Sequence, residues 1–581
     1  MRRVVSGIML GFLLVSTLVL AFNVGLVRAQ APQTVYINSD GSVSPSSAPI
    51  SSVDNVTYTF TGNMSYPSYD GIVVERNNTV IDGNSYTMLG NNSGNSNDQS
   101  VGLNLTDTSN VTIENTNIEN FQNGIYLSGS NNNIIRANTA TANGLDGIWL
   151  NSSSNNNTVS DNNAKANLSC GIDVIGSSNN NTVSGNTATA NGYFGIILTI
   201  SSNNTVSGNT ATANNDTGIQ IYSSSGNILS DNVIEDNKYN FNVLGYVLSD
   251  FMNSVDTSNL VNGKPIYYMT SKSNLVISSQ NYPNVGYLAL VNCTKMTVEG
   301  LTLANVCMQG ILLAFTNDSK ITDNNVANNY DGIYLRYSSN DTVDENTATA
   351  NGVGIDIYSS SNNTVSGNNA TADSVGIVLQ SYSNIVSGNN VTANGDGIYL
   401  IGSSNSTIIG NNVTANNAGI YLDGSSNNTI SGNNATANTH GIVLIDSSNN
   451  TFSGNTVAAN SQDGIWLMGS SNNTLCCNNF INNTLQVDSD KSPNVWDNGY
   501  PSGGNYWSDY QTKYPNAVKN DSSGIWNTPY VIDTNNTDHY PLMVSYVVPE
   551  FPLILLLPLF MIATLLAVAF YKKKAMQHKL L

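Results

Sequence analysis

The sequence predicts an all-β fold, a right-handed parallel β-helix of about 17 turns with 21–24 residues per turn, ending in an aromatic cap and a C-terminal transmembrane helix. Two observations predict the solenoid. The eleven residues NTVSGNTATAN at 181–191 recur letter for letter at 204–214. Each repeat also carries three short apolar segments, and such a unit buries its apolar side only when neighbouring units stack on it.

One asparagine recurs at the same position of every repeat, and a glycine usually precedes it. Glycine suits a bend with positive φ, and aspartate takes its place at Asp161, Asp231 and Asp323. Successive turns lie about 4.8 Å apart, so we expect each asparagine amide to pair with those above and below it. Such a ladder satisfies buried polar groups that otherwise cost about 1–3 kcal/mol each. The predicted ladder is Asn138, Asn162, Asn186, Asn209, Asn232, Asn324, Asn346, Asn368, Asn389, Asn411, Asn433, Asn455 and Asn478.

The N-terminal residues 1–31 have the pattern of a secretory signal peptide. Arg2 and Arg3 precede a long apolar run, and small residues follow around Ala29. An uncleaved N-terminal anchor is the alternative. Residues 32–101 are predicted to hold the N-terminal cap and the first turns, and residues 102–246 the first half of the β-helix.

The repeat is interrupted at residues 247–283, which we predict to be an inserted loop. Binding residues are often carried by such interruptions. Lys264, Tyr267 and Tyr268 are ligand-binding candidates here, because tyrosines on a projecting polar loop can stack on sugars and bond their hydroxyls. The alternative is a hairpin that lies on the side of the helix with its tyrosines buried.

Residues 284–489 are predicted to form the second half of the β-helix, and a cluster of charges spans two of its turns. By register, Asp323 and Glu345 are expected one turn apart, near enough for a shared Ca²⁺ or an acid/base pair. A solvated surface patch is the alternative. The candidate catalytic residues are Asp323, Asp331, Arg336, Asp341, Glu345 and Asp356.

Residues 490–545 are not repetitive and are rich in aromatic residues, including Trp496, Trp507 and Trp526. A solenoid needs a cap over its open core, and aromatic side chains supply one. Carbohydrate or Ca²⁺ binding in this module is an additional prediction, with Tyr506 and Trp507 as the ligand-binding candidates.

Residues 549–574 are predicted to be a membrane anchor or sorting signal, and residues 575–581 a cytoplasmic tail. The stretch 553–570 is uncharged and mostly apolar, and three lysines follow at 572–574. This pattern predicts a secreted protein held at the outer face of the cytoplasmic membrane by a single C-terminal segment, unless that segment is removed.

Several motifs carry a resemblance to a known family. The GNN and GNT turns, the segment NGKPIYY and the ending GGNYWSDY…TPYVID…YPLM resemble archaeal surface proteins of the NosD-like right-handed β-helix family, and the PEF tripartite tail resembles their sorting signals. The resemblance covers residues 35–545 and implies β-helix repeats of the kind found in carbohydrate-binding proteins and sugar hydrolases. The resemblance also implies copper binding, and copper sites use His, Cys and Met side chains as ligands. Copper binding is not predicted, because the chain has only three His and its five Cys are dispersed.

The amino-acid composition restricts the classes of partner that the protein is expected to bind. The net charge is −20, with 39 acidic and 19 basic residues, so nucleic acid is not an expected partner. The sequence predicts a surface-anchored structural or adhesive protein that binds a polysaccharide, with catalysis not expected. A polysaccharide lyase or glycoside hydrolase acting through residues 318–356 is the first alternative, and a NosD-like copper-handling protein the second. No cofactor is predicted, and Ca²⁺ binding is kept as an alternative.

Overall fold

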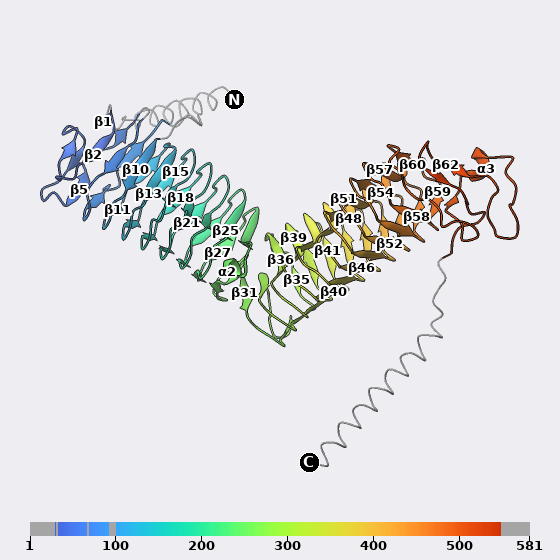
Figure 1. Cartoon of the computed structure of the whole chain (residues 1–581). Helices are drawn as coiled ribbons and strands as arrows, with labels where there is room; N and C mark the ends of the chain where they lie inside the picture. Colours follow the sequence, from blue (N-terminus) through green and yellow to red (C-terminus); the bar gives the residue numbers. More distant parts are fainter. Residues whose placement is uncertain (1–28, 31–32, 67–68, 92–99, 548–581) are drawn as a thin grey trace, which may run out of the picture.

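The computed structural model describes residues 29–30, 33–66, 69–91 and 100–547. These residues coil into a right-handed β-solenoid of about 19 turns, and each turn adds one short strand to each of three sheets (Figure 1). The predicted parallel β-helix is confirmed. The turns outnumber the predicted 17, and one of the additional turns lies in segment 247–283, which does not project as a loop but joins the sheets of the coil through its strands.

The described residues hold no helix long and apolar enough to cross a membrane. The helices found there, α2 (Leu248–Phe251) and α3 (Tyr510–Lys513), have four residues each. The predicted transmembrane helix, and the single-span anchorage at the outer face of the membrane that depended on it, are contradicted by this finding. Residues 549–581, and nearly all of the predicted signal peptide, lie outside the described residues.

The solenoid has two arms that meet at an elbow near β31 (Figure 1). We define the N-terminal arm as the described residues of 29–262 and the C-terminal arm as residues 263–547. Each arm has an inner sheet built from the Gly-Ile-x-Leu segments. That of the N-terminal arm contains β2 (Val35–Ile37), β7 (Ile72–Val74), β10 (Val101–Thr106), β13 (Asn123–Ser128), β16 (Ile148–Asn151), β19 (Ile172–Ile175), β22 (Ile196–Thr199), β25 (Thr217–Tyr222) and β28 (Tyr239–Leu244), with β3 (Val43–Ser44) at its edge.

Two further sheets complete the N-terminal arm. One contains β4 (Ile50–Ser51), β5 (Thr57–Phe60), β8 (Val80–Asp82), β11 (Thr112–Glu114), β14 (Ile134–Arg136), β17 (Thr158–Ser160), β20 (Thr182–Ser184), β23 (Thr205–Ser207), β26 (Ile228–Ser230) and β29 (Ser254–Val255). The other contains β1 (Ala29–Gln30), β6 (Met64–Ser65), β9 (Thr87–Leu89), β12 (Asn117–Glu119), β15 (Thr139–Thr141), β18 (Asn163–Lys165), β21 (Thr187–Thr189), β24 (Thr210–Thr212), β27 (Val233–Glu235) and β30 (Leu260–Val261).

The C-terminal arm repeats the three-sheet plan. Its inner sheet contains β31 (Lys264–Thr270), β33 (Tyr287–Val291), β36 (Gln309–Ala314), β39 (Asp331–Arg336), β42 (Val353–Tyr358), β45 (Val375–Gln380), β48 (Asp396–Ile401), β51 (Ala418–Asp423), β54 (His440–Ile445), β57 (Asp463–Met468) and β60 (Leu485–Ser489). The second sheet contains β32 (Val276–Ser278), β34 (Thr297–Glu299), β37 (Lys320–Thr322), β40 (Thr342–Asp344), β43 (Thr364–Ser366), β46 (Ile385–Ser387), β49 (Thr407–Ile409), β52 (Thr429–Ser431), β55 (Thr451–Ser453) and β58 (Thr474–Cys476). The third contains β35 (Thr302–Leu303), β38 (Asn325–Ala327), β41 (Thr347–Thr349), β44 (Asn369–Thr371), β47 (Asn390–Thr392), β50 (Asn412–Thr414), β53 (Asn434–Thr436), β56 (Thr456–Ala458), β59 (Asn479–Ile481) and β61 (Tyr506–Trp507).

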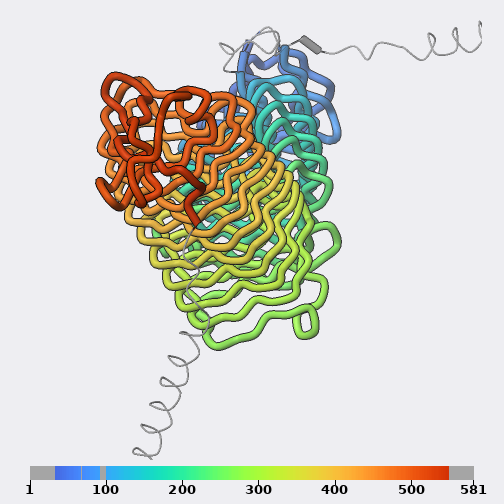
Figure 2. Tube along the Cα trace, turned by 90° about the vertical axis from the view of Figure 1, so that its right-hand side faces the viewer, coloured from blue at the N-terminus to red at the C-terminus, as the bar shows by residue number. Residues whose placement is uncertain are grey.

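Successive turns stack directly on one another (Figure 2), and their register places identical residues side by side. Val183 lies opposite Val206 in the parallel pair β20–β23, and the Asn186 amide donates to Asn209 Oδ1 at 2.9 Å. The thirteen asparagines form two such stacks, from Asn138 to Asn232 and from Asn324 to Asn478, with amide contacts of 2.9–3.1 Å between neighbours. Each amide therefore satisfies buried groups on two turns.

The elbow comes from a chain reversal. Asn262 and Gly263 have φ of 47° and 73° and link β30 to β31 as an antiparallel hairpin. Positive φ at both residues is the requirement of a two-residue type I′ turn, which Asn-Gly meets best. One sheet therefore runs through both arms, as the third sheet of the first arm and the inner sheet of the second.

The far end of the C-terminal arm is covered by residues 490–547, which include β62 (Tyr530–Val531) and β63 (Thr537–Asp538). Trp507 is 1% exposed, and its ring stacks between Phe480 at 4.5 Å and Tyr530 at 4.2 Å. Trp507 Nε1 donates to Asp538 Oδ2 at 2.8 Å. These rings close the apolar core of the last turn.

Candidate functional site

The inner sheets of the two arms meet at the elbow through their outward-facing side chains. The Gln309 amide on β36 donates to Asn242 Oδ1 on β28 at 3.1 Å, and Arg336 Nε donates to the Gly245 carbonyl at 2.8 Å. From this contact the arms diverge (Figure 1). The outer faces of both inner sheets therefore turn toward the opposite arm.

Three of the six catalytic candidates, Asp331, Arg336 and Asp356, come together at this elbow, where the first two are buried and Asp356 is half-buried. Asp331 and Arg336 are 4% and 5% exposed, and Asp331 Oδ1 and Asp356 Oδ1 have no hydrogen-bond partner. Burial raises the pKa of Asp331 well above its ordinary value, and the nearby Asp356 adds to that shift. Burial also raises the pKa of Asp356 to about 7. The N-terminal arm covers these groups, so a polymer has no access to them.

The other three candidates lie elsewhere on the coil. Asp341 is buried inside a polar column, where its Oδ1 accepts from the Ser319 N–H at 2.8 Å and burial raises its pKa to about 8. Asp323 and Glu345 follow the paired residues Thr322 and Asp344 on successive turns, at bends with φ of 54° and 57°. These two carboxylates belong to the bend column, away from the elbow.

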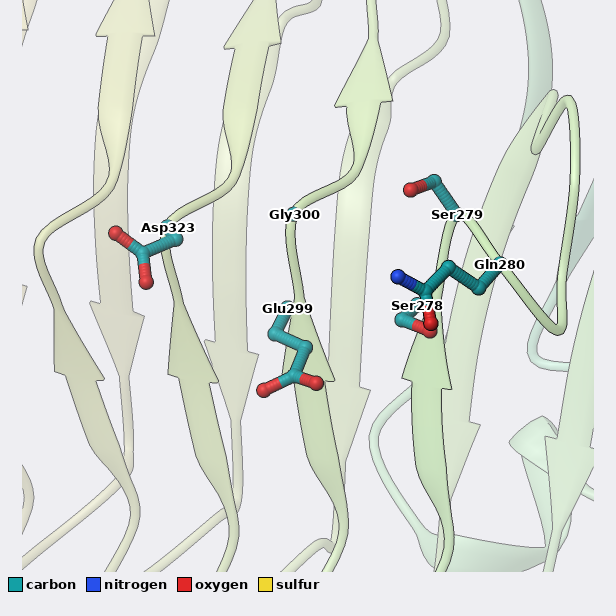
Figure 3. Close-up of a pocket in the computed structure, with 6 residues that line it drawn as sticks. All are labelled: Ser278, Ser279, Gln280, Glu299, Gly300 and Asp323. Atoms are coloured by element: carbon teal, nitrogen blue, oxygen red, sulfur yellow. The ribbon is translucent and has the colours of Figure 1, made fainter.

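Asp323 lines an open hollow of about 260 Å³ at the surface of the second sheet. Figure 3 shows its carboxylate at the bend after β37 and that of Glu299 at the end of β34, with Ser278 at the end of β32 and Gln280 just beyond it. No basic residue lines the hollow. Acidic and hydroxyl side chains of this kind are common on a solvated surface, and the hollow carries no function by itself.

The ligand-binding candidates of the interrupted segment and the cap mostly have structural roles. Tyr268 is partly buried and its hydroxyl donates to the Phe251 carbonyl at 2.6 Å. Tyr267 packs edge-on against Tyr282 at 5.2 Å. Lys264 and Tyr506 are half-buried, and Trp507 lies in the core of the cap. These residues therefore do not form one exposed face.

A different set of side chains lies along the outer face of the C-terminal inner sheet. Along β48 the core residues Ile398 and Leu400 alternate with the half-buried outward residue Tyr399. Tyr399 lies opposite Tyr421 on β51, and Val443 lies opposite Trp466 two turns further on. We call Tyr399, Tyr421, Asp423, His440, Asp463 and Trp466 the aromatic stripe.

The two tyrosines form the first half of the aromatic stripe. Their ring centroids are 4.5 Å apart with planes tilted by 10°, and the Tyr399 hydroxyl lies 3.2 Å from Asp423 Oδ2. Burial, with the charge of Asp423, raises the pKa of both hydroxyls, so both stay protonated near neutral pH. The pair presents aromatic surface, hydroxyl donors and a carboxylate acceptor side by side.

The second half contains an oriented imidazole. His440 Nδ1 lies 2.9 Å from Asp463 Oδ2, and its ring lies 5.4 Å from that of Trp466. A carboxylate at Nδ1 fixes the tautomer and orientation of a histidine. The hydrogen bond of this ring within the described chain is made at Nδ1, which leaves Nε2 as the ring nitrogen that can bond a ligand.

The stripe has no positive charge near it in the chain. No Lys or Arg occurs between Arg336 and Lys491, whereas Asp396, Asp423 and Asp463 lie on the inner strands of this stretch. The face therefore suits a ligand that donates hydrogen bonds and repels one that carries carboxylates or sulfates.

The aromatic stripe was not predicted from the sequence. A signal for it exists in the third residue of the motif Gly-Ile-x-Leu, which is Tyr399, Tyr421 or Trp466 in three of the turns. Once the register is known, the x position of that motif always faces outward.

The sequence model of a family described as "Periplasmic copper-binding protein (NosD)" matches residues 153–259, 251–417 and 377–512, which is more than half of the chain. A model of the "Right handed beta helix region" matches residues 35–188. No curated protein matches the sequence.

Solved structures resemble the chain in fold. The periplasmic alginate epimerase AlgG is 13% identical with a TM-score of 0.22, covering 77% of this chain and 78% of its own. The mannuronan C-5 epimerase AlgE6 A-module of Azotobacter vinelandii is 13% identical with a TM-score of 0.21, covering 73% and 88%. DFA-IIIase from Arthrobacter chlorophenolicus is 12% identical with a TM-score of 0.33, covering 49% and 84%. Likeness at this level concerns the fold alone.

Proposed function

We propose that this chain, which belongs to the NosD family, binds a neutral polysaccharide along the aromatic stripe of its C-terminal arm. The observation that carries the proposal is the stacked pair Tyr399–Tyr421 beside Asp423, followed along the same face by His440 and Trp466. Carbohydrate sites combine aromatic faces with a few fixed polar groups, and both are present here.

The geometry of the coil suits an extended ligand. Successive turns lie about 4.8 Å apart, so the stripe from Tyr399 to Trp466 spans three steps, about 14 Å. A rigid sheet holds every side chain of the stripe, which lowers the entropy lost on binding. A chain of several sugar units therefore fits better than a single sugar.

Charge supports the choice of a neutral ligand. A polysaccharide of uronic acids would need cations to balance its carboxylates, and the stretch from Arg336 to Lys491 contains none. Sugar hydroxyls, in contrast, can donate to Asp423 and accept from the Tyr421 hydroxyl, since the Tyr399 hydroxyl already donates to Asp423. The same reasoning keeps nucleic acid outside the proposal.

The first alternative, a lyase or hydrolase acting through residues 318–356, is not the function that we propose. Asp331 and Arg336 are buried under the N-terminal arm, and Asp341 lies inside the coil. Neither place gives a polymer access to a pair of carboxyl groups, which glycoside hydrolysis requires on both sides of the scissile bond.

Copper, which the family description names, fits poorly with the side chains present. Copper sites use His, Cys and Met. In the described residues, the one group of three close potential ligands is Asp146, Cys170 and Asp173, which supplies two carboxylates and one thiol. His440 and His539 are each paired with an aspartate. Copper handling, the second alternative, is therefore not proposed.

The test is a glycan array that carries neutral, uronic-acid and sulfated polysaccharides, probed with the full chain in the presence and absence of Ca²⁺. We expect retention on neutral glycans alone, independent of Ca²⁺. Tyr421→Ala and Trp466→Ala should each weaken binding at least about tenfold, since stacked aromatic anchors dominate such interfaces. No retention on any neutral glycan would refute the proposal.

A matched control is Tyr382→Ala. Tyr382 belongs to the same arm and is 56% exposed, but it lies at a bend outside the aromatic stripe. Its loss should leave binding unchanged. Equal losses of glycan binding in Tyr382→Ala and Tyr421→Ala would show that any surface tyrosine contributes to binding. The aromatic stripe would then have no special role.

A further inference from the structure

A second site lies on the inner sheet of the N-terminal arm, apart from the aromatic stripe. Asp146 precedes β16, Cys170 precedes β19, and Asp173 lies within β19. One potential ligand atom of each, the thiol sulfur and two carboxylate oxygens, lies within 4.8 Å of the others. Asp146 and Cys170 are 6% and 5% exposed.

Register explains why these groups meet. Ile148 pairs with Ile172, so Asp146 and Cys170, each two residues earlier, lie one above the other. The Cys170 N–H donates to Asp146 Oδ1 at 2.8 Å, which fixes that carboxylate against the next turn. Asp173 faces outward on β19, three residues after Cys170, and completes the triangle.

Independent evidence for a ligand comes from unsatisfied atoms. Asp173 Oδ1 is fully buried and has no hydrogen-bond partner, and neither has the Trp149 Nε1–H. Trp149 lies directly opposite Asp173 in the sheet, and Ile197 lies on its other side. A buried oxygen without a donor and a buried N–H without an acceptor each cost free energy. A hydrated cation satisfies both, since the metal takes the oxygen and its water accepts from Trp149.

We propose that Asp146, Cys170 and Asp173 form a three-ligand zinc site with one open position facing Trp149. Zinc accepts thiolate and carboxylate ligands together, in sites that keep a fourth position for water. Calcium requires six to eight oxygens, and copper prefers imidazole and sulfur. Ligand bonds of about 2.0–2.3 Å put tetrahedral ligand atoms about 3.5 Å apart. Side-chain rotations that move the ligand atoms by about 1 Å therefore close the site.

The test is titration of the metal-free full chain with Zn²⁺ by calorimetry and with Co²⁺ by absorption spectroscopy. We expect one equivalent of tight binding, and a thiolate-to-cobalt charge-transfer band that marks a sulfur ligand. Cys170→Ser should abolish that band, and Asp173→Asn should weaken Zn²⁺ binding at least about tenfold. Both substitutions are nearly isosteric, and circular dichroism of the metal-free variants checks that the coil is intact.

Cys477→Ser and Asp356→Asn are the controls, because they remove another thiol and another half-buried outward-facing aspartate. Neither substitution should change the number of Zn²⁺ ions bound per chain or the thiolate-to-cobalt charge-transfer band. Weak binding of several equivalents that Cys170→Ser leaves unchanged would show adsorption to an acidic surface and would overturn the proposal. So would a cobalt band that disappears only in Cys477→Ser.

Discussion

Asp341 occupies a position that asparagine fills on the next turn, and we predict that Asp341→Asn stabilises the protein. The Asp341 Oδ1 atom accepts from the Ser319 N–H, but its buried Oδ2 has no partner. One turn later, the Asn363 amide donates to the Ser338 carbonyl at 3.3 Å and to Asn384 Oδ1 at 3.2 Å. An amide at position 341 can make the two equivalent bonds, to Thr316 and Asn363.

The magnitude follows from two effects. Two additional hydrogen bonds contribute about 0.5–1.5 kcal/mol each, so the gain is about 2 kcal/mol while the carboxyl is neutral in both states. Burial raises the folded pKa of Asp341 to about 8, from 3.8. Between these values the unfolded chain loses the proton and the folded chain keeps it, so wild-type stability falls as pH rises. The advantage of Asp341→Asn should therefore grow from pH 4 to pH 8.

The assay is urea unfolding followed by circular dichroism at pH 5 and pH 8. Asp446→Asn, at an exposed bend of the same arm, is the matched control. It should change the free energy of unfolding by less than about 0.5 kcal/mol. An Asp341→Asn protein that is no more stable than wild type, or whose gain is the same at both pH values, would refute the reasoning.

Three further predictions concern the scaffold. Asn209 makes four hydrogen bonds through its side chain, so Asn209→Ala should cost about 4 kcal/mol in chemical unfolding, while the exposed Asn215→Ala should cost less than about 0.5 kcal/mol. Gly263 has φ of 73° with open space around it, so Gly263→Ala should lower stability by about 1 kcal/mol through backbone strain alone, measured as a lower thermal midpoint. Trp507→Ala should cost about 3–5 kcal/mol and lead the cap to open before the arms, which hydrogen exchange at residues 490–547 would detect.

The solenoid could be predicted because its determinants are local and repeated. Asn186 and Asn209 sit in identical eleven-residue segments, and a period shared by apolar residues and bends leaves few other folds. The elbow was missed, although Asn262-Gly263 is a hairpin signal, because the surrounding segment lacks the repeat and was interpreted as a projecting loop. One turn beyond the predicted number, which begins with β31, lies in this region.

The site was harder to predict, because it depends on which residues the coil brings to the surface and which it covers. Asp331 and Asp356 are brought together as charge clustering suggested, but the chain reversal at Gly263 lays the other arm over them. Tyr421 and Trp466 are 45 residues apart in the sequence and occupy positions that vary from turn to turn. Nothing in the repeat marks such positions until the register fixes their direction.

The proposal of a neutral glycan on the aromatic stripe is tested most directly by ¹⁹F NMR of the full chain labelled with 5-fluorotryptophan. Trp466 lies on the stripe, whereas Trp496 and Trp507 are 1% exposed inside the cap. Titration with a neutral polysaccharide that the protein retains should shift the Trp466 resonance, assigned by Trp466→Phe, and leave those of Trp496 and Trp507 in place. Saturating binding with an unmoved Trp466 resonance would contradict the account.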